Sequence, residues 1–256
     1  MKIVRAIGFI VLYLAIYVAV QLVSQSVLSQ LSLQVSFIVN NVCTLAIYAL
    51  LMKARKRSLP IFCRVKAIST KALLIAPLIG IALGTVIYSV ANLPVIREDW
   101  PQIYNLVEFV GGGSSIALTL LGTVLVGSLF EEVLFRGLIL NEVRAVSPVY
   151  VAVLVQAVLF GVILMDPILG GFAALGALVY GLVYWASDSL WASLITHVFS
   201  SGTVMVWFQM GDLSTAVSSS AVFWTSLSVL LVLLAVHLQF VARGRGAASL
   251  ASGVSP

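Results

Sequence analysis

Apolar stretches long enough to cross a lipid bilayer dominate this chain. Hydrophobic residues make up 61% of its 256 positions and charged residues only 9%, whereas soluble domains are about 45–50% apolar. A helix needs about 20 apolar residues to span the hydrocarbon core, where it satisfies its own backbone hydrogen bonds. Windows of this length predict spans at residues 7–27, 33–52, 72–93, 114–138, 148–165, 168–186, 190–208 and 221–241. We therefore predict an all-α polytopic membrane protein, a bundle of about eight transmembrane helices.

The basic residues are distributed unevenly over the segments that connect these spans. If both termini are cytoplasmic, 13 of the 14 Lys and Arg residues lie in cytoplasmic segments and only Arg97 lies outside. The 13 are Lys2, Arg5, Lys53, Arg55, Lys56, Arg57, Arg64, Lys66, Lys71, Arg136, Arg144, Arg243 and Arg245. Cytoplasmic segments of membrane proteins carry such an excess. We therefore expect both termini to be cytoplasmic, residues 94–113 to be external, and the protein to lie in the plasma (inner) membrane.

This topology accounts for the net charge of +5, so the charge indicates no nucleic-acid partner. The basic run 53–71 would lie on the inner membrane surface, where it either attracts anionic lipid or only sets the topology. Membrane lipid is therefore one expected partner. Cys43 falls within the second span and Cys63 on the cytoplasmic side, so we expect neither a disulfide nor a cysteine metal site.

Small residues recur at helical spacing within two of the spans. Gly80 and Gly84 are four residues apart, and Gly176 and Gly181 are five apart. Glycines allow the backbones of two membrane helices to approach closely. We predict helix–helix contacts at these positions.

Two adjacent carboxylates and an arginine lie in the apolar segment 115–140, where charged groups are costly and therefore indicate a functional site. Glu132 and Arg136 are four residues apart, a spacing that places them on one helix face as an ion pair. Glu131 lies about 100° around the helix from Glu132. We therefore expect Glu131 to be the freer carboxylate and the one that carries chemistry. The alternative is that all three form a buried polar cluster that joins helices.

His197 lies within the seventh span, beside Ser200 and Ser201, and a buried imidazole needs a polar partner. Counted from the cytoplasmic ends of their helices, Glu131 and His197 fall at a similar depth, so they can share one layer. Gln156 could join them as a neutral hydrogen-bonding group. A carboxylate and an imidazole in a partly hydrated cavity could activate water for hydrolysis, with or without a metal.

The sequence from Glu131 to Arg136 resembles the EExxxR motif of the CAAX-protease and bacteriocin-processing family of intramembrane endopeptidases, also called the Abi family. The segment His197–Ser201 is similar to the family's HxxxN motif, and Phe160–Leu164 falls where the family has FxxxH. The resemblance covers roughly residues 114–208. It implies that Glu131 is the general base, that Glu132 and Arg136 orient the site, and that His197 is a polar ligand.

Two positions depart from the family motifs. Leu164 replaces the middle histidine and Ser201 replaces the asparagine, although a hydroxyl retains a hydrogen bond at the same helical offset from His197. A conventional catalytic zinc site has three protein ligands, so Glu131 and His197 are candidate ligands for a weakly held divalent metal such as zinc. Asp166 is two residues after Leu164 and about 200° around the helix, which makes it a poor substitute. No other cofactor is expected.

Three classes of function remain open. The first is an endopeptidase that hydrolyses a peptide bond of a membrane-associated peptide or protein near the cytoplasmic face, with catalytic residues Glu131, Glu132, Arg136, His197 and Ser201. The second is a catalytically inactive relative that retains the cavity as a membrane scaffold or regulatory binding protein. The third is an unrelated transporter. The intact EExxxR motif favours the first two classes, and Leu164 distinguishes between them.

The chain has no linker long or polar enough to separate a second domain. We divide it into N-terminal membrane helices and loops at 1–113, a motif-bearing core at 114–208, and a last span with a disordered tail at 209–256. Small and polar residues at the C-terminal end are the basis for the predicted disorder.

Overall fold

The computed structural model of the protein describes residues 1–28, 30–111, 115–210 and 220–252, and these form helices joined by short connections, with no strand among them. The first half of the chain forms α1 (Lys2–Val27), α2 (Leu33–Ala54), α3 (Leu59–Phe62), α4 (Thr70–Ala91), α5 (Pro94–Asp99) and α6 (Pro101–Gly111). The second half forms α7 (Ile116–Thr119), η1 (Leu120–Gly127), α8 (Ser128–Glu131), η2 (Glu132–Ile139), α9 (Leu140–Arg144), α10 (Val149–Val162), α11 (Pro167–Ser187), α12 (Leu190–Gln209) and α13 (Ser220–Ser252).

Seven helices in this described part are long and apolar enough to cross a membrane. The chain is therefore an all-α polytopic membrane protein, as the sequence predicts. The expected fifth span, 148–165, is instead the shorter helix α10, which has 14 residues. At 1.5 Å per residue α10 is about 21 Å long, less than the ~30 Å hydrocarbon core. Pro148 stands before its first turn, and the chain leaves the helix ahead of Pro167.

The helix that carries the two glutamates runs continuously from α7 to α9 and contains two π-helical stretches, η1 and η2. A π-helical turn has i→i+5 hydrogen bonds, and such turns occur often at functional sites. Glu131 ends α8, and Glu132 and Arg136 belong to η2. The motif thus lies where the backbone changes from α- to π-helical geometry.

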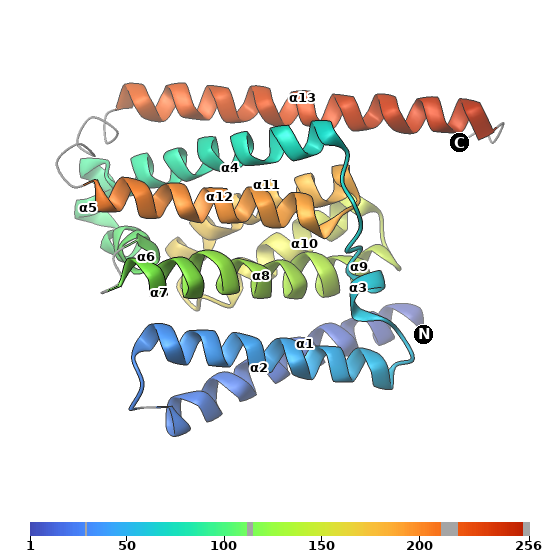
Figure 1. The fold of residues 1–256 in the computed structure, drawn as a ribbon, viewed down its shortest axis with the longest axis horizontal. Helices are drawn as coiled ribbons and strands as arrows, with labels where there is room; N and C mark the ends of the chain where they lie inside the picture. The colour runs from blue at the N-terminus through green and yellow to red at the C-terminus, as the bar shows by residue number, and fades with distance from the viewer. Residues whose placement is uncertain (29, 112–114, 211–219, 253–256) are drawn as a thin grey trace.

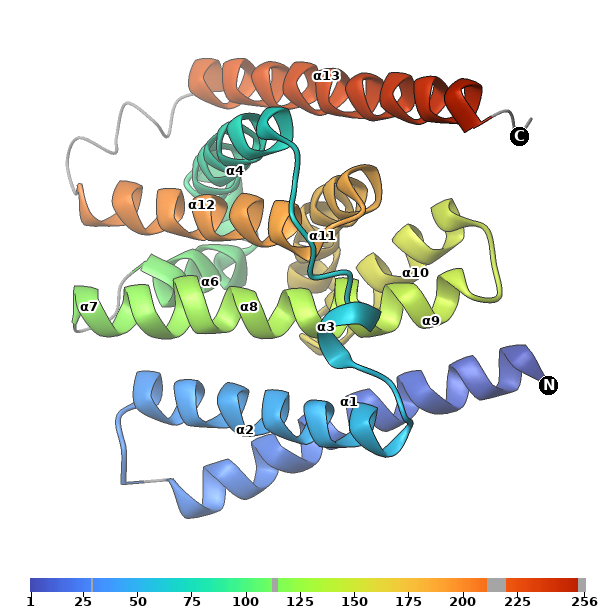
Figure 2. The same ribbon diagram turned by 45° about the vertical axis from the view of Figure 1, so that its right-hand side comes forward.

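Figures 1 and 2 show this helix between two sets of neighbours. The α1–α2 hairpin, in blue, lies on one side, and α12, α4 and then α13 follow on the other. Helices α10 and α11 pack against each other behind the central helix. The start of α1, the connection that contains α3 and the C-terminal end of α13 all lie at one end of the bundle (Figure 1).

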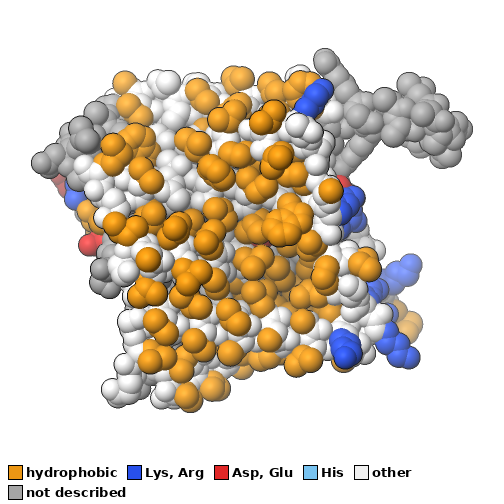
Figure 3. Space-filling view, viewed as in Figure 1, with side chains coloured by type: hydrophobic (Ala, Val, Ile, Leu, Met, Phe, Trp, Pro, Cys, Tyr) orange, Lys and Arg blue, Asp and Glu red, His pale blue; other side chains and the backbone are white. Residues whose placement is uncertain are grey.

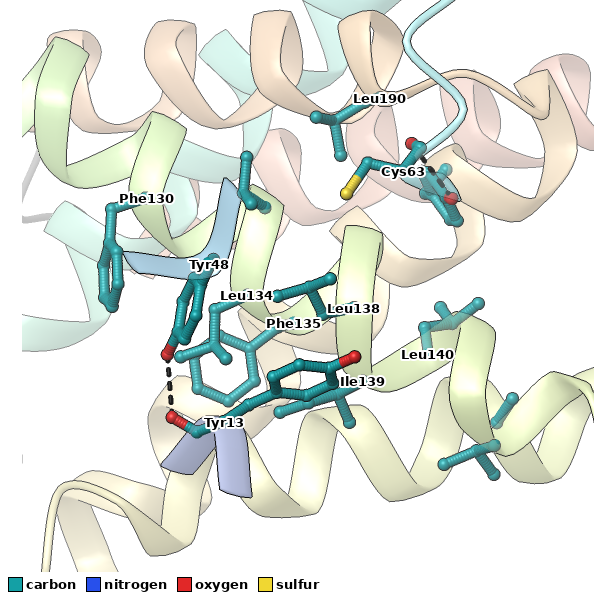
Figure 4. Packing of buried hydrophobic residues seen from close by; sticks show 14 of the residues in the cluster. Tyr13, Tyr48, Cys63, Phe130, Leu134, Phe135, Leu138, Ile139, Leu140 and Leu190 are labelled. Atoms are coloured by element: carbon teal, nitrogen blue, oxygen red, sulfur yellow. Dashed lines mark hydrogen bonds between the residues drawn. The ribbon is translucent and has the colours of Figure 1, made fainter. Parts of the chain in front are cut away.

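An aromatic and aliphatic core joins the hairpin to the central helix (Figure 4). The Tyr48 hydroxyl donates a 2.8 Å hydrogen bond to the Tyr13 carbonyl. Arg55 forms a 2.6 Å ion pair with Glu142 of α9, and both side chains are nearly buried. The hairpin is therefore fixed to the core by apolar packing and by a charged contact near one end.

The predicted glycine contacts are confirmed at α4 and corrected at one position of α11. A Cβ atom on Gly80 or Gly84 would lie 2.8 Å from the Cβ of Phe199 or Thr203 of α12, so these two helices approach closely. Gly181 faces the Gln156 side chain. At Gly176, in contrast, an added Cβ atom would meet nothing within 4 Å, because this glycine borders a cavity and not a neighbouring helix.

The predicted disordered tail is also corrected. Helix α13 continues past the apolar span to Ser252, and residues 253–256 lie outside the described part of the chain. Residues 242–251 include four alanines and no proline, and a helix that is already formed propagates at little cost through such residues, although Gly244 and Gly246 in the same stretch oppose it.

Candidate active site

The buried ion pair at the centre of the site has the predicted geometry. Arg136 Nη1 lies 3.2 Å from Glu132 Oε1, and both side chains are completely buried. Arg136 Nη2 donates a 3.1 Å hydrogen bond to the Ala177 carbonyl of α11. This pair therefore links η2 to α11 and leaves Arg136 no access to solvent.

His197 of α12 lies between the two glutamates. Its Nδ1 is 2.9 Å from Glu132 Oε1 and its Nε2 is 3.6 Å from Glu131 Oε2. Because an ionised carboxylate only accepts hydrogen bonds, Nδ1 is the donor to Glu132 and the Nε2 edge faces Glu131. The predicted convergence of Glu131, Glu132, Arg136 and His197 is thus confirmed.

The two glutamates differ in exposure. The Glu131 side chain is 31% exposed, whereas the Glu132 side chain is completely buried. Glu131 is therefore the freer carboxylate, as expected. Glu132 accepts contacts from both His197 and Arg136, which fixes its position and the orientation of the imidazole.

Tyr180 of α11 is a site residue that the sequence did not indicate. Its ring stacks on the imidazole of His197, with centroids 4.2 Å apart and an interplanar angle of 17°. The Arg136 guanidinium carbon lies 5.1 Å from the same ring centroid, within cation–π distance. In the sequence, the one indication of this role is that Tyr180 lies in the middle of a predicted span, where its hydroxyl needs a polar partner.

A cavity of about 260 Å³ opens from this polar group. Its polar lining consists of Glu131, His197 and the hydroxyl residues Thr123, Ser128, Ser200 and Ser201. The remaining lining is mostly apolar and comes from seven helices and a turn, through Tyr17, Phe37, Ile87, Leu106, Phe160, Leu164, Phe172, Tyr180 and Val204. The cavity therefore offers an apolar space that ends at a carboxylate and an imidazole.

The other residues considered from the sequence occupy different places. Leu164 and Ser201 both line the cavity, as the motif alignment predicts. Gln156 does not line it but donates a 3.0 Å hydrogen bond to the Ala177 carbonyl, the acceptor that Arg136 also uses. Asp166 caps α11 by accepting a hydrogen bond from the Leu169 amide, so it does not replace a histidine at the site.

His237 is not a site residue. Its Nε2 lies 3.0 Å from the Ser187 hydroxyl, which ties α13 to the end of α11. The histidine is buried between these helices. Packing of α13 against its neighbours decides this burial.

The donor set does not fit a conventional zinc site. Glu131 Oε2 and His197 Nε2 face one cavity, but the third motif position is Leu164, whose side chain has no donor atom. No group of three or more His, Cys, Asp and Glu residues that could hold a metal occurs within the described ranges. A hydroxyl such as that of Ser201 is a poor third ligand for zinc.

Comparison with protein families identifies the part of the chain that contains this site. Residues 113–203 match the family described as type II CAAX prenyl endopeptidase Rce1-like. This match supports a CAAX-protease-like domain in this part of the chain. The matched region includes both glutamates, Arg136, Leu164, His197 and Ser201, and it agrees with the region predicted from the motifs. Comparison with curated proteins and with solved structures gave no match.

Proposed function

We propose that the protein is an intramembrane endopeptidase of the CAAX-protease and bacteriocin-processing (Abi) type. It would hydrolyse a peptide bond of a membrane-associated peptide or protein near the cytoplasmic face of the plasma membrane, with both termini cytoplasmic. The observation that carries this proposal is the partly exposed Glu131 facing His197 Nε2 at the polar end of an apolar cavity.

In this proposal Glu131 is the general base. It takes a proton from a water molecule, whose oxygen attacks the carbonyl carbon of the substrate peptide bond. The Ser201 hydroxyl would donate a hydrogen bond to the oxyanion that forms. The C–N bond then breaks, and the proton held by Glu131 passes to the leaving amine. One water is consumed and the products are an amine and a carboxylic acid.

The buried groups behind Glu131 would act by position. Glu132 holds His197 Nδ1 at 2.9 Å, so that the Nε2 edge faces the reacting water. Arg136 balances the charge of Glu132, and Tyr180 supports the imidazole from its face. Fixed groups of this kind require little rearrangement during the reaction.

A catalytically inactive relative is the second candidate, because a specific observation favours it. Leu164 gives the cavity an apolar wall where the motif has a histidine, and the cavity nevertheless persists. Such a protein would bind a membrane-embedded segment as a scaffold or regulator. It would hold the segment without cleaving it.

A proteolysis assay in liposomes tests both candidates. The probe is a fluorogenic peptide with a farnesylated C-terminal CAAX sequence, and the variants are the wild type, Glu131→Gln and Glu98→Gln. Glu98 is exposed in α5, away from the cavity, so its substitution makes the same chemical change as a control. We expect Glu131→Gln to reduce cleavage by about 10²–10⁴-fold and Glu98→Gln to leave it unchanged. Binding of the peptide without cleavage by the wild type would favour the inactive relative.

A further inference from the structure

A second hollow lies at the end of the bundle that contains α3, separate from the active-site cavity. It encloses about 490 Å³, and its charged lining consists of three arginines, Arg57, Arg64 and Arg144. The described residues that line it include none of those around Glu131 and His197. Figure 3 shows Lys and Arg side chains gathered at this end of the molecule.

The connection that bears two of these arginines is fixed to the core. Asn141 Nδ2 donates a 3.0 Å hydrogen bond to the Phe62 carbonyl, and the Leu190 amide donates one of 3.1 Å to the Arg64 carbonyl. Cys63, between them, is completely buried, and this burial raises the pKa of its thiol to about 12. A connection that only sets topology would need none of these contacts. The backbone here holds its basic side chains in defined places.

Asp188 and Phe62 position the three guanidinium groups. Arg64 and Arg144 both contact Asp188 Oδ1, the latter at 3.4 Å. The Arg57 guanidinium carbon lies 5.1 Å from the centre of the Phe62 ring. The three cations are therefore held around one space before any ligand arrives, which lowers the entropic cost of binding.

The hollow retains a net positive charge. Asp188 contacts Arg64 and Arg144, and its Oδ2 also lies 2.5 Å from Lys66 Nζ. One carboxylate thus faces three cations, two of which, Arg64 and Arg144, line the hollow together with Arg57. Like charges held this close favour a bound anion that compensates them.

We propose that this hollow binds the phosphate group of an anionic phospholipid headgroup. Guanidinium groups match phosphate oxygens with paired hydrogen bonds, and basic pockets at the cytoplasmic side of membrane helices are suited to lipid headgroups. Ile61 lines the same hollow and is 80% exposed, so an apolar surface lies beside the charges. A lipid satisfies both features, because its phosphate is joined to a glycerol and acyl chains, whereas free phosphate has no apolar part.

The site has a direct connection to the catalytic helix. Arg144 ends α9, which continues η2, the stretch that contains Glu132 and Arg136. A bound headgroup would hold the end of this helix against α3 and the start of α12. The proposal does not depend on catalysis, because the hollow and its charges exist whether or not the active site is functional.

Native mass spectrometry of the detergent-purified full chain tests the site with phosphatidylglycerol as the probe and phosphatidylcholine as the neutral-headgroup comparison. The double variant Arg57→Gln/Arg144→Gln removes two charges from the hollow and leaves Asp188 paired with Arg64 and Lys66. The control Lys53→Gln/Lys56→Gln removes two charges from exposed neighbouring positions that do not line the hollow. We expect at least a tenfold loss of phosphatidylglycerol affinity in the first variant and less than about a twofold loss in the control.

Two results would overturn the proposal. An equal loss in both double variants would mean that the lipid is attracted by diffuse charge. Displacement of the lipid by millimolar inorganic phosphate, with the same dependence on Arg57, would identify free phosphate as the ligand. If the double variant does not fold, the comparison of Arg57→Gln with Lys56→Gln decides the question, since both side chains are exposed and adjacent in sequence.

Discussion

Glu131 and Glu132 illustrate how position changes the role of one residue type. Glu132 contacts Arg136 and His197 and has no exposure, so its charge is committed to the structure. Glu131 borders the cavity and makes its closest charged contact, at 3.6 Å, with His197. Replacement of the two adjacent glutamates should therefore change the stability of the protein by different amounts.

Replacement of Arg136 by alanine should destabilise the protein more than Glu131→Gln does. Arg136→Ala leaves Glu132 buried without its main cation, a change that costs roughly 3–5 kcal/mol for buried pairs, and it also removes the hydrogen bond to the Ala177 carbonyl. Glutamine keeps the volume of Glu131 at a partly exposed position. Thermal melts in detergent should rank the two variants in this order, and the opposite ranking would make Glu131 a structural residue.

Leu164→His should create a metal site that the wild type lacks. Leu164 lines the cavity with Glu131 and His197, so an imidazole there would supply a third strong ligand. We expect zinc affinity to rise in this variant and to stay low in Leu164→Ala and in the wild type. Elemental analysis of the purified proteins measures this. Stoichiometric zinc in the wild type would refute the prediction and require another ligand.

At the scale of elements, the contact between α4 and α12 positions the histidine. Gly80 and Gly84 allow the α4 backbone to approach α12, the helix that bears His197. A methyl group at Gly84 would lie 2.8 Å from the Thr203 Cβ and still closer to the Ser200 carbonyl. Backbone atoms cannot yield to such a contact without a shift of the whole helix.

Gly84→Ala should therefore destabilise the protein by about 1–3 kcal/mol, the usual cost of overpacking. Gly176→Ala is the matched control, because a Cβ there meets nothing within 4 Å and alanine has the higher helix propensity. We expect its thermal midpoint to be unchanged or slightly raised. Equal midpoints for both variants would show that α4 and α12 are not in tight contact.

At the scale of the whole molecule, the charge distribution predicts the orientation in the membrane. Residues 53–71 should face the cytoplasm and residues 94–113 the exterior, because 13 of the 14 basic residues then lie inside. A membrane-impermeant maleimide should label Asn105→Cys but not Lys56→Cys in intact cells, in a background lacking Cys43 and Cys63. Both positions are exposed and should react after permeabilisation. Labelling of position 56 alone in intact cells would reverse the topology.

The fold class and much of the site were predictable from local patterns. The length of the apolar stretches identified the long helices, and the four-residue spacing of Glu132 and Arg136 predicted their ion pair. Both features are local, because each lies within a single helix. Length alone failed for α10, which proline-bounded turns shorten to 14 residues. The small and polar composition of the tail also misled the prediction there, since α13 continues to Ser252.

The sequence by itself determined that this chain crosses a membrane and which charged residues must find partners there, since burial of an unpaired charge in hydrocarbon is costly wherever the helices lie. Only the tertiary structure decided that the Tyr180 ring stacks on His197 and that Gln156 and Arg136 donate to the same carbonyl oxygen. It also decided that Gly176 borders a cavity. Finally, it placed Arg64 and Arg144 in contact with Asp188. These contacts join residues far apart in the chain. The packing of the helices sets the distances between these residues, and the spacing of residues within one helix does not determine how the helices pack.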